Sequence, residues 1–303
     1  MLLFRLHPLR FCFVARERIY FPPGKSSNIL RGAFGTIFRR IACVPQCTSA
    51  RECDWRASCP YARMFEPAAM GSGPSGLADW PRPFVFRAMH LDDRTIQAGE
   101  AFYFDLNLFD TRPEAVAYLV LAFTQLAREG LGPGRSRVEL TGVCQLDGNG
   151  IAVEPAFPKV PAPLELDLTA GEPVSRVCVQ FLTPTELKSG QQLAARPEFG
   201  ILAARIRDRI STLRELYGDG PLDIDFRAFG DRAAQVRMTR CDVRQVDVVR
   251  RSSRTGQVHS ISGFVGGAEY EGELAEFISY LRAARWTGAG RQTVWGKGAI
   301  ETS

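Results

Sequence analysis

The sequence predicts an α+β protein whose two halves share one order of strands and helices. A chain of 303 residues is long enough for two domains of ordinary size. In each half, apolar residues recur with a period of two in some segments and with helical spacing in others, in the order β-α-β-β-α-β. Between the halves, prolines at 155, 158, 161, 163 and 173 indicate an extended linker.

The first half begins with a strand that we expect at 2–15, interrupted at Pro8. Apolar residues at 30–41 then follow the i, i+3, i+4, i+7 spacing of an amphipathic helix, which Ser27 or Asn28 would cap. The later elements of this half are strands at 83–87, 101–109 and 137–146, and a helix that Pro113 starts and Gly130 stops.

The second half repeats the pattern. We expect strands at 176–182, 237–251 and 258–265, helices at 197–217 and 272–285, and a last strand that contains a glycine-rich stretch. This order is that of the ferredoxin-like split βαβ fold. The sequence therefore predicts two tandem ferredoxin-like domains, at 1–150 and 174–303, joined by a proline-rich linker at 151–173.

Composition narrows the function classes. The net charge is +5, and 34 of the 38 basic residues are arginines. Arginine suits phosphate recognition through its planar guanidinium, although a GC-rich genome also produces an arginine-rich protein. No apolar run approaches the roughly 20 residues that span a bilayer, and no export signal is visible, so we expect a cytoplasmic protein without a membrane partner. In such a protein, eight cysteines argue against a disulfide framework.

The stretch GAGRQTVWGKGA at 288–299 combines four glycines with an arginine and a lysine. A P-loop would need Ser or Thr directly after the lysine, and a dinucleotide fingerprint would open a helix instead of following the last one. Glycine can leave successive N–H groups exposed, and these bind anions; a tight turn with a bulge is the alternative. We therefore expect contacts to a phosphate backbone from the amides of Gly288, Gly290, Gly296 and Gly298 and the side chains of Arg291, Thr293 and Lys297.

Four segments together resemble a known family. They are the glycine-rich loop, GFVGGAEYEG at 263–272, FLTPTELK at 181–188 and LRGAFG at 30–35. In this order they resemble the CRISPR-associated RAMP endoribonucleases that process precursor guide RNA. The resemblance implies metal-independent cleavage within the CRISPR repeat, in which a 2′-hydroxyl attacks the adjacent phosphate and leaves a 2′,3′-cyclic phosphate. It implies CRISPR repeat RNA as the partner and admits other CRISPR effector subunits.

That chemistry needs one group to deprotonate the 2′-hydroxyl and another to protonate the leaving oxygen. In the family the base is often a histidine on or near the first helix, where Thr36 stands in this sequence. We favour His90, which ends a strand beside a loop, with Tyr20 and Lys25 as further candidates for proton transfer or phosphate stabilisation. Each of the three is also an ordinary surface or packing residue in other proteins. A non-catalytic RNA-binding subunit of an effector complex is the alternative function.

Four cysteines are crowded into a segment at 43–60, where Cys43, Cys47, Cys53 and Cys59 have the spacing C-x3-C-x5-C-x5-C. Four thiolates on a short segment can hold a tetrahedral ion. The pattern lacks paired CxxC motifs, and its Cys-Pro end resembles iron–sulfur ligation. We expect structural zinc, with an iron–sulfur cluster or unliganded thiols as alternatives, and no cofactor for catalysis. An unrelated metalloprotein would leave the glycine-rich loop unexplained.

Overall fold

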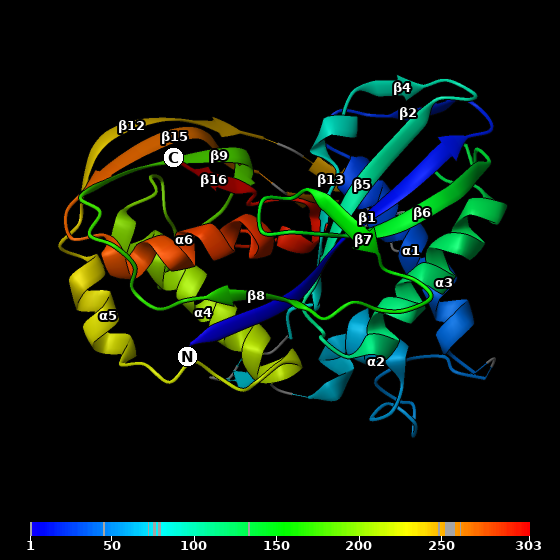
Figure 1. Cartoon of the computed structure of the whole chain (residues 1–303), viewed down its shortest axis with the longest axis horizontal. Coiled ribbons are helices and arrows are strands. Elements are labelled where there is room, and N and C mark those ends of the chain that lie inside the picture. The colour runs from blue at the N-terminus through cyan, green and yellow to red at the C-terminus, as the bar shows by residue number, and fades with distance from the viewer. Residues whose placement is uncertain are drawn as a thin grey trace. The chain divides into compact units, whose positions relative to one another are not determined.

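The computed structural model describes residues 2–44, 46–71, 73–74, 77, 80–132, 134–247, 249–251, 258–260 and 262–303, without the side chains at 69, 249–251 and 258–260. The chain divides into two compact units (Figure 1). The first unit is Arg5–Leu164 with Glu215–Asp219, and the second is Met1–Phe4, Glu165–Arg214 and Gly220–Ser303. The change from one unit to the other at 164–165 falls inside the segment that the sequence predicted as a linker.

The first unit is built on an antiparallel sheet with the strand order β3-β5-β1-β6-β7. Its strands are β1 (Leu3–Ala15, of which Arg5 onward lies in this unit), β3 (Phe84–Arg87), β5 (Ala101–Leu108), β6 (Val138–Leu146) and β7 (Ala152–Pro155). A further strand, β8 (Leu164–Asp167), pairs with β1, but all of it after Leu164 belongs to the second unit. Two long helices, α1 (Ser26–Ala42) and α3 (Pro113–Glu129), pack against each other. The core lies between the sheet and these helices, where the rings of Phe11 and Phe34 both contact Phe123.

Two predicted details of this unit are wrong. The strand β1 runs through Pro8 without a break, because the ladder to β6 starts only at Leu9 and a missing N–H is tolerated at the end of a ladder. The N-cap residue of α1 is Lys25, and neither Ser27 nor Asn28 occupies that position. The predicted helix between Pro113 and Gly130 is confirmed as α3.

Several short elements could not be predicted from the sequence, because they span too few residues to show periodicity. The strands β2 (Ile19–Phe21) and β4 (Arg94–Ile96) pair with each other and lie side by side in Figure 1. Others in this unit are α2 (Pro60–Met64) and the 3₁₀ turns η1 (Pro67–Met70) and η3 (Met89–Leu91). The segment predicted as an irregular linker holds β7 and β8.

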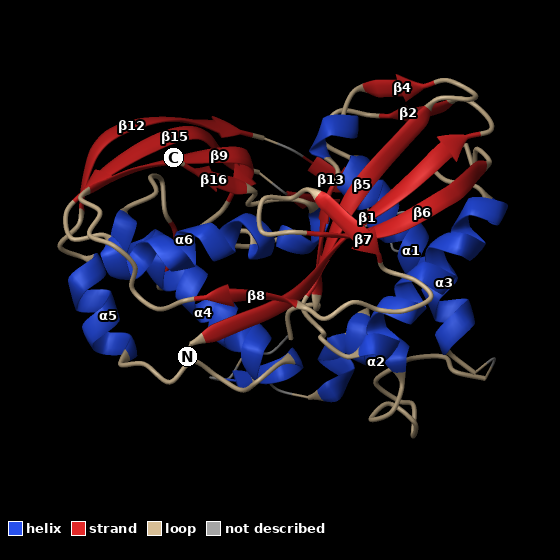
Figure 2. Ribbon diagram, in the orientation of Figure 1, coloured by secondary structure: helices blue, strands red, loops and turns tan. Residues whose placement is uncertain are grey.

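The second unit contains a four-stranded antiparallel sheet with the order β12-β15-β9-β16. Its main elements are β9 (Arg176–Thr185), α4 (Phe199–Tyr217), β12 (Arg237–Val246), β15 (Gly263–Glu271), α6 (Ala275–Thr287) and β16 (Ile300–Thr302). Helices α4 and α6 cover one face of this sheet (Figure 2). Phe199 packs edge-on against both Tyr270 and Phe277 in the core between them.

The long strand predicted at 237–251 is two strands in the structure. Only β12 joins the main sheet, whereas β13 (Val249–Arg251) pairs with β14 (Val258–Ser260). The turn predicted at 252–256 lies outside the described residues. The strand predicted at 258–265 is likewise divided between β14 and β15. The last strand, β16, begins at Ile300, so the prediction that it contains the glycine-rich stretch is wrong. The unit also contains elements that the sequence did not predict: β10 (Lys188–Ser189), β11 (Gln192–Leu193), α5 (Phe226–Ala233) and the 3₁₀ turn η4 (Thr293–Trp295).

The two main sheets place their strands in the same order. In the first unit β1 lies between β6 and β5, with β3 beyond β5; in the second β9 lies between β16 and β15, with β12 beyond β15.

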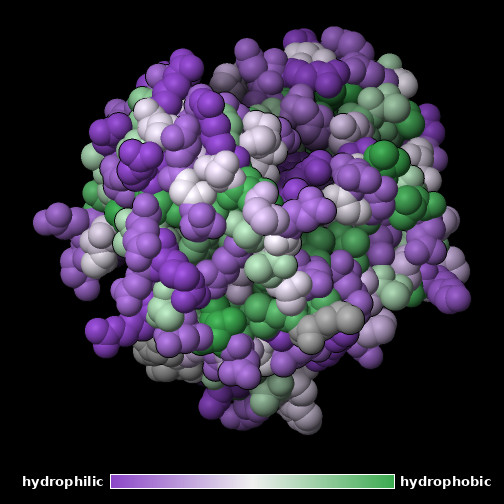
Figure 3. All heavy atoms as spheres, turned by 60° about the vertical axis from the view of Figure 1, so that its left-hand side comes forward, coloured by the Kyte–Doolittle hydropathy of each residue, from purple (hydrophilic) through white to green (hydrophobic). Residues whose placement is uncertain are grey.

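Polar residues cover much of the face shown in Figure 3, with apolar residues scattered between them. Among the described residues, no helix is both long enough and apolar enough to cross a membrane.

Candidate functional site

The loop that follows β3 is fastened to the first turn of α1. The Ser26 N–H donates to Asp92 Oδ1 at 3.0 Å, and the Ser26 hydroxyl donates to the Ala88 carbonyl at 2.7 Å. The side chain of Lys25, at the N-cap, provides no capping hydrogen bond. Asp92 therefore supplies this helix from outside with the acceptor that a capping residue normally gives, and its charge suits the positive end of the helix dipole.

Tyr20 lies beside the same loop. It is exposed on β2, and its hydroxyl donates to Asp93 Oδ1 at 3.1 Å. This hydrogen bond to Asp93 raises the pKa of Tyr20, because the carboxylate stabilises the protonated phenol. Tyr20 therefore keeps its proton at neutral pH, so it suits the role of proton donor and not that of base.

His90 sits in this loop with one ring nitrogen fixed. Its Nε2 lies 2.9 Å from the Tyr103 carbonyl oxygen, and its ring stacks on the Tyr103 ring with 4.6 Å between centroids. A carbonyl only accepts hydrogen bonds, so Nε2 carries the proton in the neutral ring and Nδ1 keeps its lone pair. In histidine bases the nitrogen that does not react commonly donates such a hydrogen bond, which fixes the tautomer.

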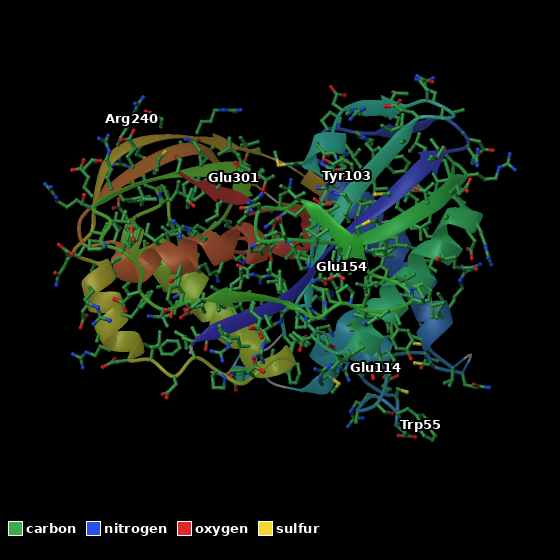
Figure 4. The ribbon with its side chains drawn as sticks, viewed as in Figure 1. Trp55, Tyr103, Glu114, Glu154, Arg240 and Glu301 are labelled. Carbon is green, nitrogen blue, oxygen red and sulfur yellow. The ribbon has the colours of Figure 1, made fainter. Side chains whose placement is uncertain are left out.

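The stack behind His90 is itself held in place. The Arg10 guanidinium lies 4.0 Å from the Tyr103 ring centroid and donates to both carboxylate oxygens of Asp105, at 2.7 and 2.9 Å. Tyr103 lies on β5, and Figure 4 labels it there. The loop, the sheet and the stack together limit the orientations open to the imidazole.

The structure thus brings the three predicted candidates to one loop and one helix end. His90 belongs to the loop, Tyr20 contacts it through Asp93, and Lys25 is exposed directly before the first turn of α1 that Asp92 contacts. Sequence reasoning missed the two aspartates. The available signal was their position directly after the histidine, in HLDD at 90–93.

Two further positions bear on the identity of the base: His7, the other histidine of the first unit, and Thr36, where the family often has histidine. His7 is buried, with Nδ1 3.2 Å from Gln145 Oε1 and Nε2 3.4 Å from the Thr111 carbonyl, which fits a packing role. Thr36 is exposed on α1, and its hydroxyl donates to the Gly32 carbonyl at 3.2 Å. Thr36 lies ten residues after Ser26, the first residue of α1, which is about 15 Å along the helix. Thr36 is therefore remote from the end of α1 that the His90 loop contacts.

The glycines of the 288–298 loop serve the fold of the second unit. All four have positive φ, between 66° and 81°. A Cβ at Gly298 would lie 2.0 Å from the Ala289 carbonyl oxygen, and one at Gly290 would lie 2.2 Å from the Glu186 carbonyl oxygen. Only glycine allows both this backbone conformation and so close an approach.

Three of the four glycine amides are used inside the protein, so the expectation that they face a phosphate backbone does not hold for them. The donors are Gly288 to Ala284 at 2.8 Å, Gly296 to Thr293 at 2.9 Å and Gly298 to Pro184 at 3.1 Å. A loop packed against its own unit must satisfy its backbone groups there. The glycine spacing therefore reflects a tight helix-to-strand connection.

The side chains of the loop divide in the same way. Thr293 and Lys297 are 3% and 5% exposed, so neither projects into solvent. The Arg291 side chain is half exposed and pairs with the Glu186 carboxylate, while its backbone N–H donates to the Glu186 carbonyl at 3.0 Å. Of the three predicted anchors, Arg291 is the one whose charge solvent reaches.

The four thiols of the cysteine segment are linked as neighbours. Cys43, directly after α1, adjoins both Cys47 and Cys59, and Cys47 also adjoins Cys53. Burial, followed by the thiols of Cys59 and Cys47, raises the pKa of Cys43 to about 12. All four are free cysteines, and among the described residues no three Cys, His, Asp or Glu side chains are arranged to hold a metal ion. In Figure 4 the exposed Trp55 marks the same segment.

Two family models match the chain. Residues 4–158 match a family described as an N-terminal domain, and residues 179–300 match CRISPR-associated endoribonuclease Cas6. Residues 179–300 therefore belong to the CRISPR-associated RAMP endoribonucleases. The Cas6 model contains the whole glycine-rich loop, whereas the description of the model over residues 4–158 names no activity. An endoribonuclease, as the Cas6 model is described, is an enzyme that cleaves RNA.

Solved Cas6 structures share the mixed α+β fold with antiparallel sheets. A Cas6 product complex superposes with a TM-score of 0.59 at 16% identity, over 99% of each chain. Thermus thermophilus Cas6 gives 0.56 at 15% identity, over 99% of this chain and 98% of the other. A partial Cas6-RT-Cas1–Cas2 complex gives 0.58 at 11% identity, over 100% of this chain and 47% of the other. No curated protein matches the sequence.

Proposed function

We propose that this chain cleaves precursor CRISPR RNA within the repeat, with the 2′-hydroxyl beside the scissile phosphate as nucleophile. The family match and the Cas6 product complex among its structural relatives support RNA cleavage. The assignment of the site depends on the hydrogen bond between His90 and Tyr103. In it the Nε2–H of His90 donates to the Tyr103 carbonyl, so Nδ1 is left to accept a proton. We also infer that both units are ferredoxin-like, since their sheets share one strand order.

His90 acts as the general base in this proposal. Nδ1 takes the proton from the 2′-hydroxyl, and the 2′-oxygen forms a bond to phosphorus as the bond from phosphorus to the 5′-oxygen breaks. The products are a 2′,3′-cyclic phosphate and a 5′-hydroxyl, and the step uses no metal ion. A base held by a second hydrogen bond needs less reorganisation at the moment of transfer.

Tyr20 supplies the proton that the leaving 5′-oxygen needs. Its hydrogen bond to Asp93 keeps it protonated and points its hydroxyl at the same loop. Lys25 contributes positive charge to the phosphate as its oxygens gain negative charge. Both side chains are exposed, as groups that meet a polymeric substrate must be.

The glycine-rich loop contributes one contact in this scheme. Arg291 reaches the RNA backbone by exchanging its exposed carboxylate partner for a phosphate, whereas the glycines, Thr293 and Lys297 hold the loop in shape. Other CRISPR proteins are further partners; a Cas6-RT-Cas1–Cas2 complex is among the structural relatives.

We further propose a structural zinc ion at Cys43, Cys47, Cys53 and Cys59. The Cys43 thiol already adjoins those of Cys47 and Cys59, and the Cys47 thiol adjoins that of Cys53. Zinc binding would bring all four into one tetrahedral set. Protein purified without chelator should contain one zinc per chain by mass spectrometry, and Cys47→Ser should lose it. Purified protein with neither zinc nor iron would contradict a metal at this segment, and iron in place of zinc would identify a cluster.

The test of the proposed function is cleavage of a CRISPR repeat RNA by the purified full chain in EDTA, beside the same RNA with a 2′-deoxy at the cleavage position. We expect a single cut that the 2′-deoxy abolishes, and a loss of about 10²–10⁴-fold in rate for His90→Ala with RNA affinity retained. Thr36→Ala is the matched control on α1 and should cleave at the wild-type rate.

The outcomes separate the alternatives. A His90→Ala variant that cleaves like the wild type would overturn the role of His90, and a loss confined to Thr36→Ala would move the site along α1. Tight binding of the repeat without any cut would favour the non-catalytic RNA-binding subunit. Circular dichroism of each variant with and without EDTA checks that the fold persists.

A further inference from the structure

A hollow in the first unit is lined by arginines and lies apart from His90. We call it the arginine hollow; it has a volume of about 520 Å³ and lies between the end of α3 and the start of β6, with Arg16, Arg128 and Arg137 on its walls. Arg16 follows the end of β1, Arg128 is in the last turn of α3, and Arg137 directly precedes β6. Three elements far apart in sequence therefore place arginines around one opening.

Backbone contacts build this opening. The Arg16 N–H donates to the Arg137 carbonyl at 2.9 Å, and the Ser136 hydroxyl donates to the Arg18 carbonyl at 2.8 Å. These bonds hold the segment after β1 against the segment before β6. The main chain thus fixes the positions of Arg16 and Arg137, and the last turn of α3 carries Arg128, while all three side chains remain at the surface.

Positive charge exceeds negative charge around the hollow. Within residues 16–18, 128 and 135–139 there are five arginines and two glutamates. Arg16 pairs with Glu139, and Arg137 pairs with Glu17 at 2.7 Å. Among the described residues, no carboxylate lies within ion-pair distance of Arg18 or Arg128. Glu129, the nearest further acid in the chain, is engaged by Arg40.

The two ion pairs at the hollow are exposed, with Arg16 58% and Arg137 71% accessible. Exposed pairs of this kind contribute little and exchange partners readily. A phosphate diester offers a guanidinium the same two-oxygen geometry as a carboxylate, and RNA offers several phosphates at once. The charge and the exposure therefore fit a nucleic-acid backbone.

The geometry points to the arginine hollow as a binding site for the phosphate backbone of the substrate RNA, on the strand that continues past Tyr20. This inference rests on the proposed function. Arg16 lines the hollow and Tyr20 follows four residues later, a separation of at most about 14 Å in an extended chain. RNA held at the hollow would thus be aligned with the loop that carries His90.

The test measures binding without cleavage. The full chain is titrated with fluorescent repeat RNA that carries a 2′-deoxy at the cleavage position, at salt concentrations from about 50 to about 300 mM. In the hollow variant Arg16, Arg128 and Arg137 become Ala. The control variant also loses three exposed, ion-paired arginines, but in the second unit: Arg176, Arg232 and Arg240 become Ala.

The slope of log K against log salt is negative, and we expect its magnitude to decrease by about 2–3 in the hollow variant. The affinity of that variant should be at least about tenfold lower. The control variant should change less in both quantities. Equal slopes for the hollow variant and the wild type would overturn the inference while leaving cleavage intact. Equal losses in both variants would also overturn it, since any three charges would then suffice. A wild-type chain that binds no RNA would reject the proposed function together with the hollow. Arg128→Glu alone, which removes no ion pair of the hollow, repeats the test if the triple variant is unstable.

Discussion

The His90 loop and the glycine-rich loop are opposite in how conspicuous they are and in what they present to solvent. The glycine-rich loop at 288–298 is the most distinctive stretch of the sequence, yet three of its glycine amides, Thr293 and Lys297 face the interior of its own unit. The segment at 88–93 is unremarkable in sequence, yet it holds an exposed histidine with a fixed tautomer and two aspartates that organise its neighbours.

This difference shows that a distinctive pattern marks a constraint without saying whether the constraint is on the fold or on a ligand. Glycine with positive φ is required wherever a backbone must turn tightly against another backbone, and an anion site is only one such place. A histidine base, by contrast, needs one neighbour with the right acceptor, which can come from anywhere in the chain.

The largest effect that would sharpen the comparison is on stability. Gly298→Ala should lower the free energy of unfolding by about 3 kcal/mol or more, because the new Cβ would meet the Ala289 carbonyl at 2.0 Å in a backbone with φ of 66°. Gly32→Ala on α1, where a Cβ meets no atom within 4 Å, is the matched control and should stabilise by about 0.5–1 kcal/mol. Urea denaturation measures both. A Gly298→Ala protein as stable as the wild type would return the loop to a ligand-binding role.

The next effect concerns the proton donor. Tyr20→Phe should slow cleavage by about 10²-fold without changing stability noticeably, since the side chain is exposed. Because the hydrogen bond to Asp93 raises the Tyr20 pKa, the acid form persists above the ordinary tyrosine value of about 10. In Asp93→Asn the pKa falls, so the alkaline decline in rate should begin at lower pH. Rate profiles in single-turnover conditions measure this, and an unchanged Asp93→Asn profile would exclude Tyr20 as the acid.

The smallest effect is expected at Arg291. Its pair with Glu186 is at the surface, so Arg291→Ala should change the free energy of unfolding by less than about 1 kcal/mol. If Arg291 contacts one phosphate, the salt slope of RNA binding should fall by about 0.7–0.9. An unchanged slope would leave the whole glycine-rich loop with a role in folding only.

Much of the fold could be predicted from periodicity. The helix from Pro113 to Glu129 has a proline start, a glycine stop and a continuous apolar stripe, and all three survive in the structure. The strand from Arg237 could not be divided correctly, because alternation continues across residue 247 even though its two parts pair with different partners. The cap of α1 was misplaced for a similar reason, since Asp92 lies 66 residues from Ser26 in sequence.

By itself the sequence determined the resemblance to a family, the repeated order of strands and helices and the residue types available for RNA chemistry, because these depend on local spacing and on order along the chain. The tertiary structure alone decided which groups face solvent and which nitrogen of His90 can accept a proton. Those properties depend on partners distant in sequence: Tyr103 for His90, Asp93 for Tyr20, and Pro184 for Gly298. A hydrogen-bonding group has the same spacing signal whether its partner is the protein or a ligand, so only the folded chain separates the two.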